Sequence, residues 1–209
     1  TTKNYKNWLF SILNGFINEN WDTNNYISNL ESLAKKTAKD SDGLDKGTKV
    51  RHFIFNYLDY LLYKKYKDNS ILAYLPEQNI RHDKFNELKS YFDKFRFSYR
   101  HSIEHCYAQN LNKDEDLGYI EEGVKVIDNF GNLCLIEADL NSSLSDSPID
   151  VKRVKLLELL RKNQARSASL KQLIMLMYDD DCWSSQSAKK TIEKHGKRMK
   201  ELLNESFNS

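Results

Sequence analysis

The chain has 209 residues, with 32 basic and 30 acidic side chains, 7 glycines and 2 prolines. At roughly 100 to 200 residues per domain, this length allows one domain, with or without a small appendage. The net charge of +2 excludes a uniformly basic nucleic-acid coat and an acidic tail. No apolar run is long enough for a transmembrane helix, so we expect no membrane partner and a cytoplasmic location. Because the chain begins at Thr1 rather than at Met, we expect it to be part of a longer protein.

Apolar residues recur with a helical period over most of the chain, and glycine and proline are scarce. The pattern predicts helices in the segments 8–17, 26–34, 50–62, 85–95, 151–160, 170–177 and 192–203. Residues 41–47, which contain two glycines, read as a loop. The sequence therefore predicts a mainly α fold.

The period changes between these two groups of helices. From Phe95 to His105, apolar and ring-bearing residues alternate, which is the two-residue repeat of a strand. Residues 133–136 predict a second strand, and residues 137–144 a short helix that ends before Pro148. We expect a helical domain with an embedded ββα unit. Its parts are a helical N-terminal part (1–94), the ββα core (95–155) and C-terminal helices that pack on the core (156–209).

The charges are unevenly distributed along the chain. Residues 1–100 carry 17 basic and 12 acidic side chains, residues 101–150 carry 2 and 11, and residues 151–209 carry 13 and 7. One interpretation is that the acidic residues at 114–116 and 121–122 form a solvated loop. The other is a cation site in the acidic centre, with basic flanks that bind phosphate groups.

The three cysteines, Cys106, Cys134 and Cys182, form no closely spaced pair. A disulfide framework or a cysteine-ligated zinc site would need such pairs. We therefore expect reduced, packed thiols and no nucleophilic role for Cys106.

The predicted ββα unit contains a histidine and three residues with side-chain oxygen atoms that could act together. Glu104 and His105 end its first strand, Asn132 precedes its second strand, and Asn141 lies on its helix. If they converge, the imidazole can take a proton from water while the oxygen atoms bind a hard cation. These are the residue types that metal-assisted hydrolysis of a phosphodiester requires.

The same segments resemble a known family. Residues 102–105 (SIEH), Gln109, 130–135 (FGNLCL), 141–145 (NSSLS) and Lys152 are similar to the HNH-type, or His-Me finger, nuclease domain at the C-terminus of GmrSD-type restriction proteins. The resemblance is clearest over residues 95–155 and extends more weakly to Ile192. It departs at Ala108, where family members usually have proline.

The resemblance implies an endonuclease that nicks or cuts DNA with Mg²⁺ or Mn²⁺, as the effector part of an anti-phage restriction protein. By the same resemblance, His105 would be the general base and Asn132 would orient its imidazole. Glu104 and Asn141 would bind the metal ion. The implied partners are phage or modified DNA and a ParB-like nucleotide-hydrolysing domain of the same full-length protein.

Basic residues at the end of the ββα core and beyond it would bind DNA phosphates. Lys152, Arg153 and Lys155 lie at the start of a predicted helix, and a further basic run covers residues 189–200. The alternative to an enzyme is a catalytically degenerate helical module that binds DNA or a partner subunit.

Overall fold

The computed structural model describes residues 2–41, 43–76, 86, 90–109, 117–119, 123–162 and 168–208. The chain divides into two compact units, Thr1–Ser41 and Asp42–Ser209. The first unit contains α1 (Thr2–Asn18) and α2 (Tyr26–Lys39), with the rings of Phe16, Trp21 and Tyr26 packed together. The boundaries predicted at residues 94 and 155 fall inside the second unit.

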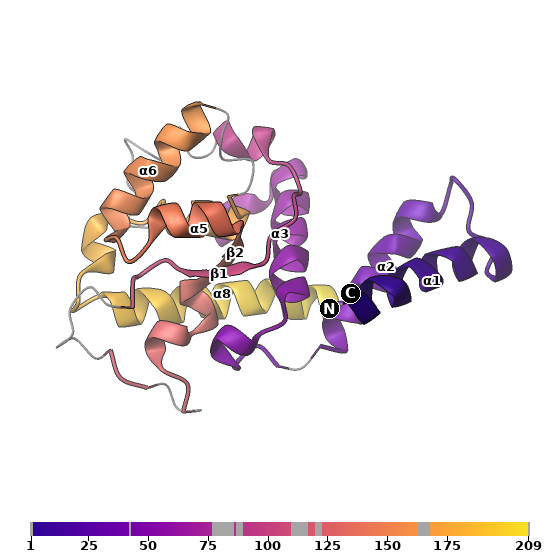
Figure 1. Ribbon diagram of the computed structural model, residues 1–209, viewed down its shortest axis with the longest axis horizontal. Coiled ribbons are helices and arrows are strands. Elements are labelled where there is room, and N and C mark those ends of the chain that lie inside the picture. The colour runs from indigo at the N-terminus through magenta and orange to yellow at the C-terminus, as the bar shows by residue number, and fades with distance from the viewer. Residues whose placement is uncertain are drawn as a thin grey trace. The chain divides into compact units, whose positions relative to one another are not determined.

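Helices dominate the second unit as well, and among its described residues one pair of strands is embedded between them (Figure 1). Its helices and strands are α3 (His52–Lys67), β1 (Ser102–His105), β2 (Leu133–Ile136), α5 (Ala138–Leu144), α6 (Ile149–Arg161), α7 (Leu170–Met175) and α8 (Ala188–Asn208). Short 3-10 turns are η1 (Gly47–Lys49), η2 (Ile71–Tyr74), η3 (Val126–Asp128), η4 (Phe130–Asn132) and η5 (Asp180–Trp183). The predicted mainly α fold with a small ββα unit is confirmed. In the described part of the chain, no helix combines the length and apolar character that crossing a membrane requires.

The predicted elements recur with small shifts, and one of them is much shorter than predicted. The first strand does not begin at Phe95: the paired segment is Ser102–His105, and residues 95–101 lie outside it. The reason is that β2 has four residues, so it can pair with only four residues of β1. Most of the helix predicted at 85–95 lies outside the described residues, although residues 90–94 are helical.

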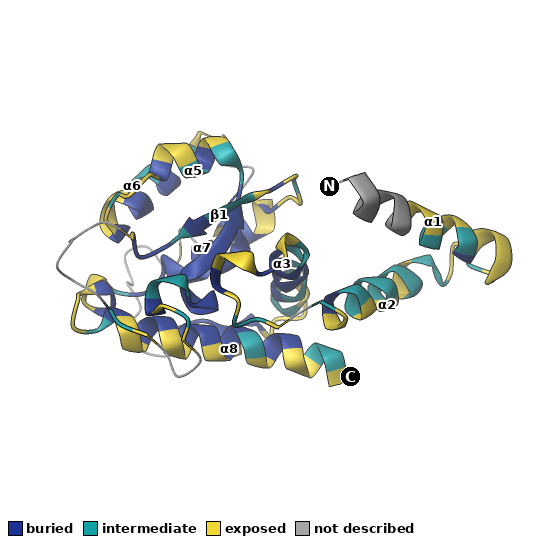
Figure 2. Ribbon diagram, turned by 60° about the horizontal axis from the view of Figure 1, so that its bottom comes forward, coloured by how far each residue is buried: buried dark blue, intermediate teal, exposed yellow. Residues whose placement is uncertain are grey.

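The two strands lie between α5 on one side and α3 and α8 on the other (Figures 1 and 2). They pair antiparallel, with Ser102 opposite Ile136 and His105 opposite Leu133. All four residues of β2 are buried, as expected for a strand that helices cover on both faces. His105 therefore stands at the end of a short strand that the core holds firmly.

A buried carboxylate connects α3 to two distant parts of the chain. Asp59 accepts hydrogen bonds from Arg100 at 2.5 Å, and from the Ser169 hydroxyl and the Lys171 backbone N–H at 3.0 Å each. The side chains of Asp59 and Arg100 are each 1% exposed, so the loss of either would leave a buried charge without its partner. Asp59 thereby links α3, the segment that leads into β1 and the start of α7.

The turn η4 lies directly against the backbone of α8. A Cβ on Gly131 would overlap the Ile192 carbonyl oxygen, and a Cβ on Gly196 would lie 2.6 Å from Asn129 Oδ1. Asn129 Oδ1 itself accepts a hydrogen bond from the Gly131 N–H at 2.7 Å. The segment from Asp128 to Asn132 is therefore fixed in place by a helix that lies about sixty residues further along the chain.

All three cysteines are free and buried, as the sequence predicts. Burial raises the pKa of the Cys106 thiol to about 12. Because the thiolate is the reactive form, Cys106 is inert at neutral pH.

Replacing Gly131 with alanine should destabilise the second unit. The new Cβ would meet a backbone oxygen of α8, which only a backbone shift can relieve, so we expect Gly131→Ala to lower the free energy of unfolding by ~3 kcal/mol. Urea denaturation measures the change. Gly43→Ala is the matched control, because a Cβ there meets nothing within 4 Å. Equal midpoints for the two variants would contradict the close contact.

Candidate active site

His105, at the end of β1, faces Asp128 of η3. Its Nε2 lies 2.8 Å from Asp128 Oδ1, and Gln109 Nε2 lies 3.3 Å from the same oxygen. Because a carboxylate only accepts, Asp128 favours the tautomer in which Nε2 carries the proton and Nδ1 is the acceptor, although the Gln109 amide nitrogen also lies 3.1 Å from His105 Nε2. The side chains of His105 and Asp128 are 14% and 28% exposed, so the pair lies at the surface of the unit.

The surroundings of His105 favour its neutral form. Burial lowers the pKa of His105, and the neighbouring Asp128 carboxylate opposes that effect by favouring the imidazolium. Since the ordinary pKa of histidine is about 6.5, the ring is neutral at pH 7 and can act as a base. Asp128 then stabilises the charge that the ring acquires with a proton.

Glu104, the neighbour of His105, forms an ion pair with Lys152 of α6. The Lys152 ammonium lies 2.7 Å from Glu104 Oε1 and donates to the His105 carbonyl oxygen at 2.6 Å. Burial raises the pKa of Glu104, and Lys152 lowers it in part. The placement of Lys152 on a DNA-binding surface is therefore corrected: its side chain is 3% exposed, because the buried carboxylate holds its charge inside.

Asn132 does not take the position next to the imidazole that the sequence led us to expect. Its amide oxygen accepts from the Tyr107 N–H at 2.7 Å, and its amide nitrogen donates to the carbonyl oxygens of Tyr107 and Ile127. Both ends of the amide are therefore engaged by backbone. Asn132 fixes the chain that follows His105, and Asp128 makes the contact with the ring.

Asn141 of α5 lies against β1. Its amide nitrogen donates to the Ser102 hydroxyl at 2.6 Å, so its carbonyl oxygen is the atom that could bind a cation. One carboxylate and one amide oxygen suit Mg²⁺, which keeps several waters and takes further oxygens from phosphate. Among the described residues, no three His, Cys, Asp or Glu side chains are placed to share a metal ion. Glu104 and Asn141 thus offer oxygen atoms of the type that a hard cation takes, and their binding of a metal ion remains a prediction.

Arg153 is a structural residue, contrary to its predicted role in DNA binding. Its side chain is 1% exposed and donates to the carbonyl oxygens of Leu176 and Tyr178 and, at 2.5 Å, to Asp180. The guanidinium is held inside because these acceptors surround it. Lys155 is half-buried and donates to the Ser143 carbonyl at 3.0 Å, and its contact with DNA remains a prediction.

Nothing in the sequence singled out Asp128 as a functional residue. The only signal was an acidic side chain four residues before Asn132, and nothing in that spacing indicates a contact with His105, which lies 23 residues away. The acidic groups at 114–116 and 121–122 lie outside the described residues.

Replacing Asp128 with asparagine should lower the pKa of His105. The carboxylate favours the imidazolium, so its removal leaves burial, which lowers the pKa, without that opposition. A titration of the His105 ring signals by NMR measures the change, with Asp139→Asn, an exposed acid on α5, as the matched control. A His105 pKa that is unchanged in Asp128→Asn would refute the pairing.

One family of known proteins matches most of the chain. The family described as GmrSD restriction endonucleases, C-terminal domain, matches residues 46–202, which include Glu104, His105, Asp128, Asn141 and Lys152. No curated protein and no solved structure matches the chain. The resemblance found in the sequence is thereby confirmed, and it implies a nuclease role in restriction. The chain belongs to the C-terminal domain family of the GmrSD restriction endonucleases.

Proposed function

We propose that the chain is an HNH-type endonuclease domain that hydrolyses phosphodiester bonds of DNA with a divalent cation. The observation that carries the proposal is the His105–Asp128 pair, a neutral imidazole whose Nε2 is 2.8 Å from a carboxylate. Membership of a restriction endonuclease family supports DNA as the substrate.

His105 would activate the attacking water. Its Nδ1 accepts the proton of the water while Nε2 remains bonded to Asp128, whose negative charge offsets the charge of the imidazolium. Asn132 and Lys152 keep the strand end in place, because both bond to backbone atoms at or next to His105.

Glu104 and Asn141 would hold Mg²⁺ or Mn²⁺. Such an ion supplies positive charge to the phosphate and to the leaving oxygen. Glu104 is buried with a raised pKa, so a second cation near it would favour the carboxylate further.

The proposal extends to partners and location. Phage or modified DNA would be the substrate, and a ParB-like nucleotide-hydrolysing domain of the same full-length protein would control cleavage. A cytoplasmic location fits a protein whose three cysteines are free and buried.

A second function, DNA binding without cleavage, is favoured by one observation. Lys152 already provides a positive charge 2.7 Å from Glu104, so a metal ion would share that carboxylate with an ammonium group. A degenerate site of this kind would bind DNA and leave it intact.

Plasmid nicking separates the two functions. We expect the parent protein to convert supercoiled plasmid to open-circular or linear DNA with Mg²⁺, and His105→Ala to be ~10²–10⁴-fold slower. His52→Ala, an exposed histidine at the start of α3, should cleave like the parent. An intact plasmid with the parent protein would favour the binding module, and a fully active His105→Ala would refute the assignment of the base.

Metal binding can be tested apart from cleavage. Asn141→Ala should weaken Mn²⁺ binding, measured by titration calorimetry, by at least the ~10–100-fold that loss of an outer-shell partner costs. Asn141→Asp should bind at least as tightly as the parent, because it supplies a carboxylate oxygen at the same place. Equal affinity in all three proteins would exclude Asn141 as a ligand.

A further inference from the structure

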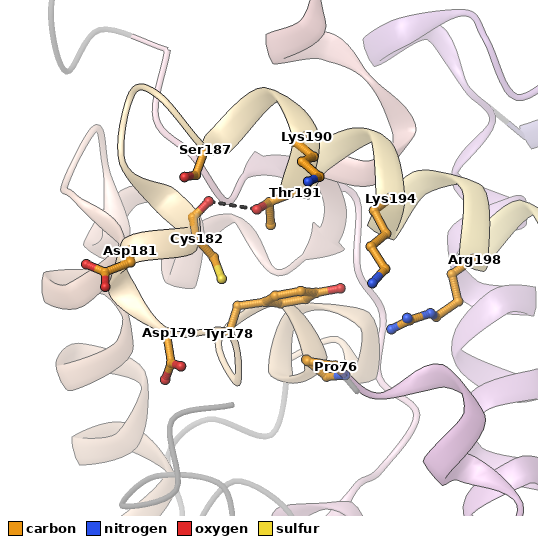
Figure 3. Close-up of a pocket in the computed structure, with 10 residues that line it drawn as sticks. All are labelled: Pro76, Tyr178, Asp179, Asp181, Cys182, Ser187, Lys190, Thr191, Lys194 and Arg198. Atoms are coloured by element: carbon orange, nitrogen blue, oxygen red, sulfur yellow. Dashed lines mark hydrogen bonds between the residues drawn. The ribbon is translucent and has the colours of Figure 1, made fainter. Parts of the chain in front are cut away.

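A polar cavity lies in the same unit, lined by residues other than those of the His105 site. It measures about 360 Å³ and is lined by residues of α8, η5 and the segment around Tyr178 (Figure 3). That volume is at the lower end of the range of small-ligand pockets and exceeds what a bare anion needs. The lining contains none of the residues placed in the candidate active site.

Three cations of α8 line this cavity at intervals of one helical turn. Lys190, Lys194 and Arg198 are four residues apart, so they share one face of the helix. Lys190 and Lys194 are exposed, and neither forms a hydrogen bond or an ion pair with any residue that the structure describes. Arg198 is 8% exposed and anchored by a bond of 2.6 Å to the Leu75 carbonyl oxygen.

The cavity is electrically asymmetric. Figure 3 shows the head groups of Lys194 and Arg198 turned toward the hydroxyl end of the Tyr178 ring, while Asp179 and Asp181 lie toward the other end of the cavity. An anion is attracted to the α8 side and repelled by the carboxylates. A ligand with a phosphate at one end and hydrogen-bond donors at the other matches both sides.

The Tyr178 ring is a rigid wall of the cavity. Trp183 and His195 contact it edge-on, with ring centroids at 5.9 Å and 5.8 Å and interplanar angles of 79° and 87°. Because Tyr178 is 5% exposed, its ring shapes the cavity and does not move out of the way of a ligand.

From these observations we propose that the cavity binds the phosphate group of a nucleotide, with Lys190 and Lys194 as its ligands and Arg198 as a fixed third charge. The nucleotide is either part of a DNA strand or free, since both present the same phosphate. For a DNA strand, the inference rests on the proposed endonuclease function. In α6, Lys152 bonds to the His105 carbonyl while Arg153 bonds to the Tyr178 carbonyl, so consecutive residues join the two sites in one unit.

The test compares two double variants of α8. Lys190→Ala/Lys194→Ala removes the charges in the cavity, and Lys189→Ala/Lys197→Ala removes two exposed charges of the same helix that do not line it. All four positions are exposed and alanine favours helix, so circular dichroism should show both variants folded. Anisotropy of a short fluorescein-labelled DNA duplex in EDTA, across a salt series, reports binding without cleavage. Calorimetry with deoxyadenosine monophosphate tests the free nucleotide.

We expect the Lys190/Lys194 variant to bind the duplex more weakly than the parent, with a slope of log affinity against log salt smaller by ~0.9 for each lost phosphate contact. The Lys189/Lys197 variant should keep most of the affinity. If deoxyadenosine monophosphate binds the parent and not the Lys190/Lys194 variant, the ligand is a free nucleotide. Binding of the duplex alone identifies a backbone phosphate.

If the two double variants behave alike with both probes, the cavity is no phosphate site. That result, combined with plasmid cleavage that depends on His105, would refute the cavity and retain the endonuclease. Nucleotide binding that depends on Lys190 and Lys194, without plasmid cleavage by the parent, would support the phosphate site and refute the endonuclease.

Discussion

The contact of Gly131 with the backbone of α8 is the constraint on which the candidate site depends. Asp128, which bonds to His105, and Asn132, which holds the chain after His105, lie on either side of this glycine. Two strands of four residues give little rigidity by themselves. The position of the carboxylate beside His105 is therefore set by a helix near the C-terminus, through a packing contact that admits no side chain.

Lys171 of α7 holds the same turn by a different interaction. Its ammonium donates to the carbonyl oxygens of Phe130 and Leu133 and lies 4.0 Å from the centroid of the Phe130 ring. Burial lowers the pKa of Lys171 to about 7. At neutral pH the side chain therefore carries less charge than an exposed lysine, while it still donates hydrogen bonds. Because the Lys171 backbone N–H also bonds to Asp59, the turn is tied through α7 to α3.

Much of the fold follows from the sequence, because local periodicity decides it. The pattern of residues 133–136 predicts β2 with the bounds that the structure has, and most of the helices lie where the apolar period places them. The chemistry of charged residues follows less well. Lys152 and Arg153 look like surface cations near the start of a helix, yet each is buried by an acceptor far away in the chain. Asp128 was missed for the same reason, since its partner His105 is brought near only by tertiary packing.

The excess of basic residues in the last third of the sequence is therefore larger than the positive charge that this segment exposes to solvent. Lys152 pairs with Glu104, Arg153 pairs with Asp180, and Lys171 lies among backbone carbonyls. Part of the positive charge of residues 151–209 is therefore buried. A group of exposed cations remains along α8, formed by Lys189, Lys190, Lys194 and Lys197. Attraction of a polyanion depends on such solvent-facing charges rather than on the net count. One face of α8 thus carries the packing contact that positions Asp128, while its exposed positions carry the charges that would draw DNA toward the site.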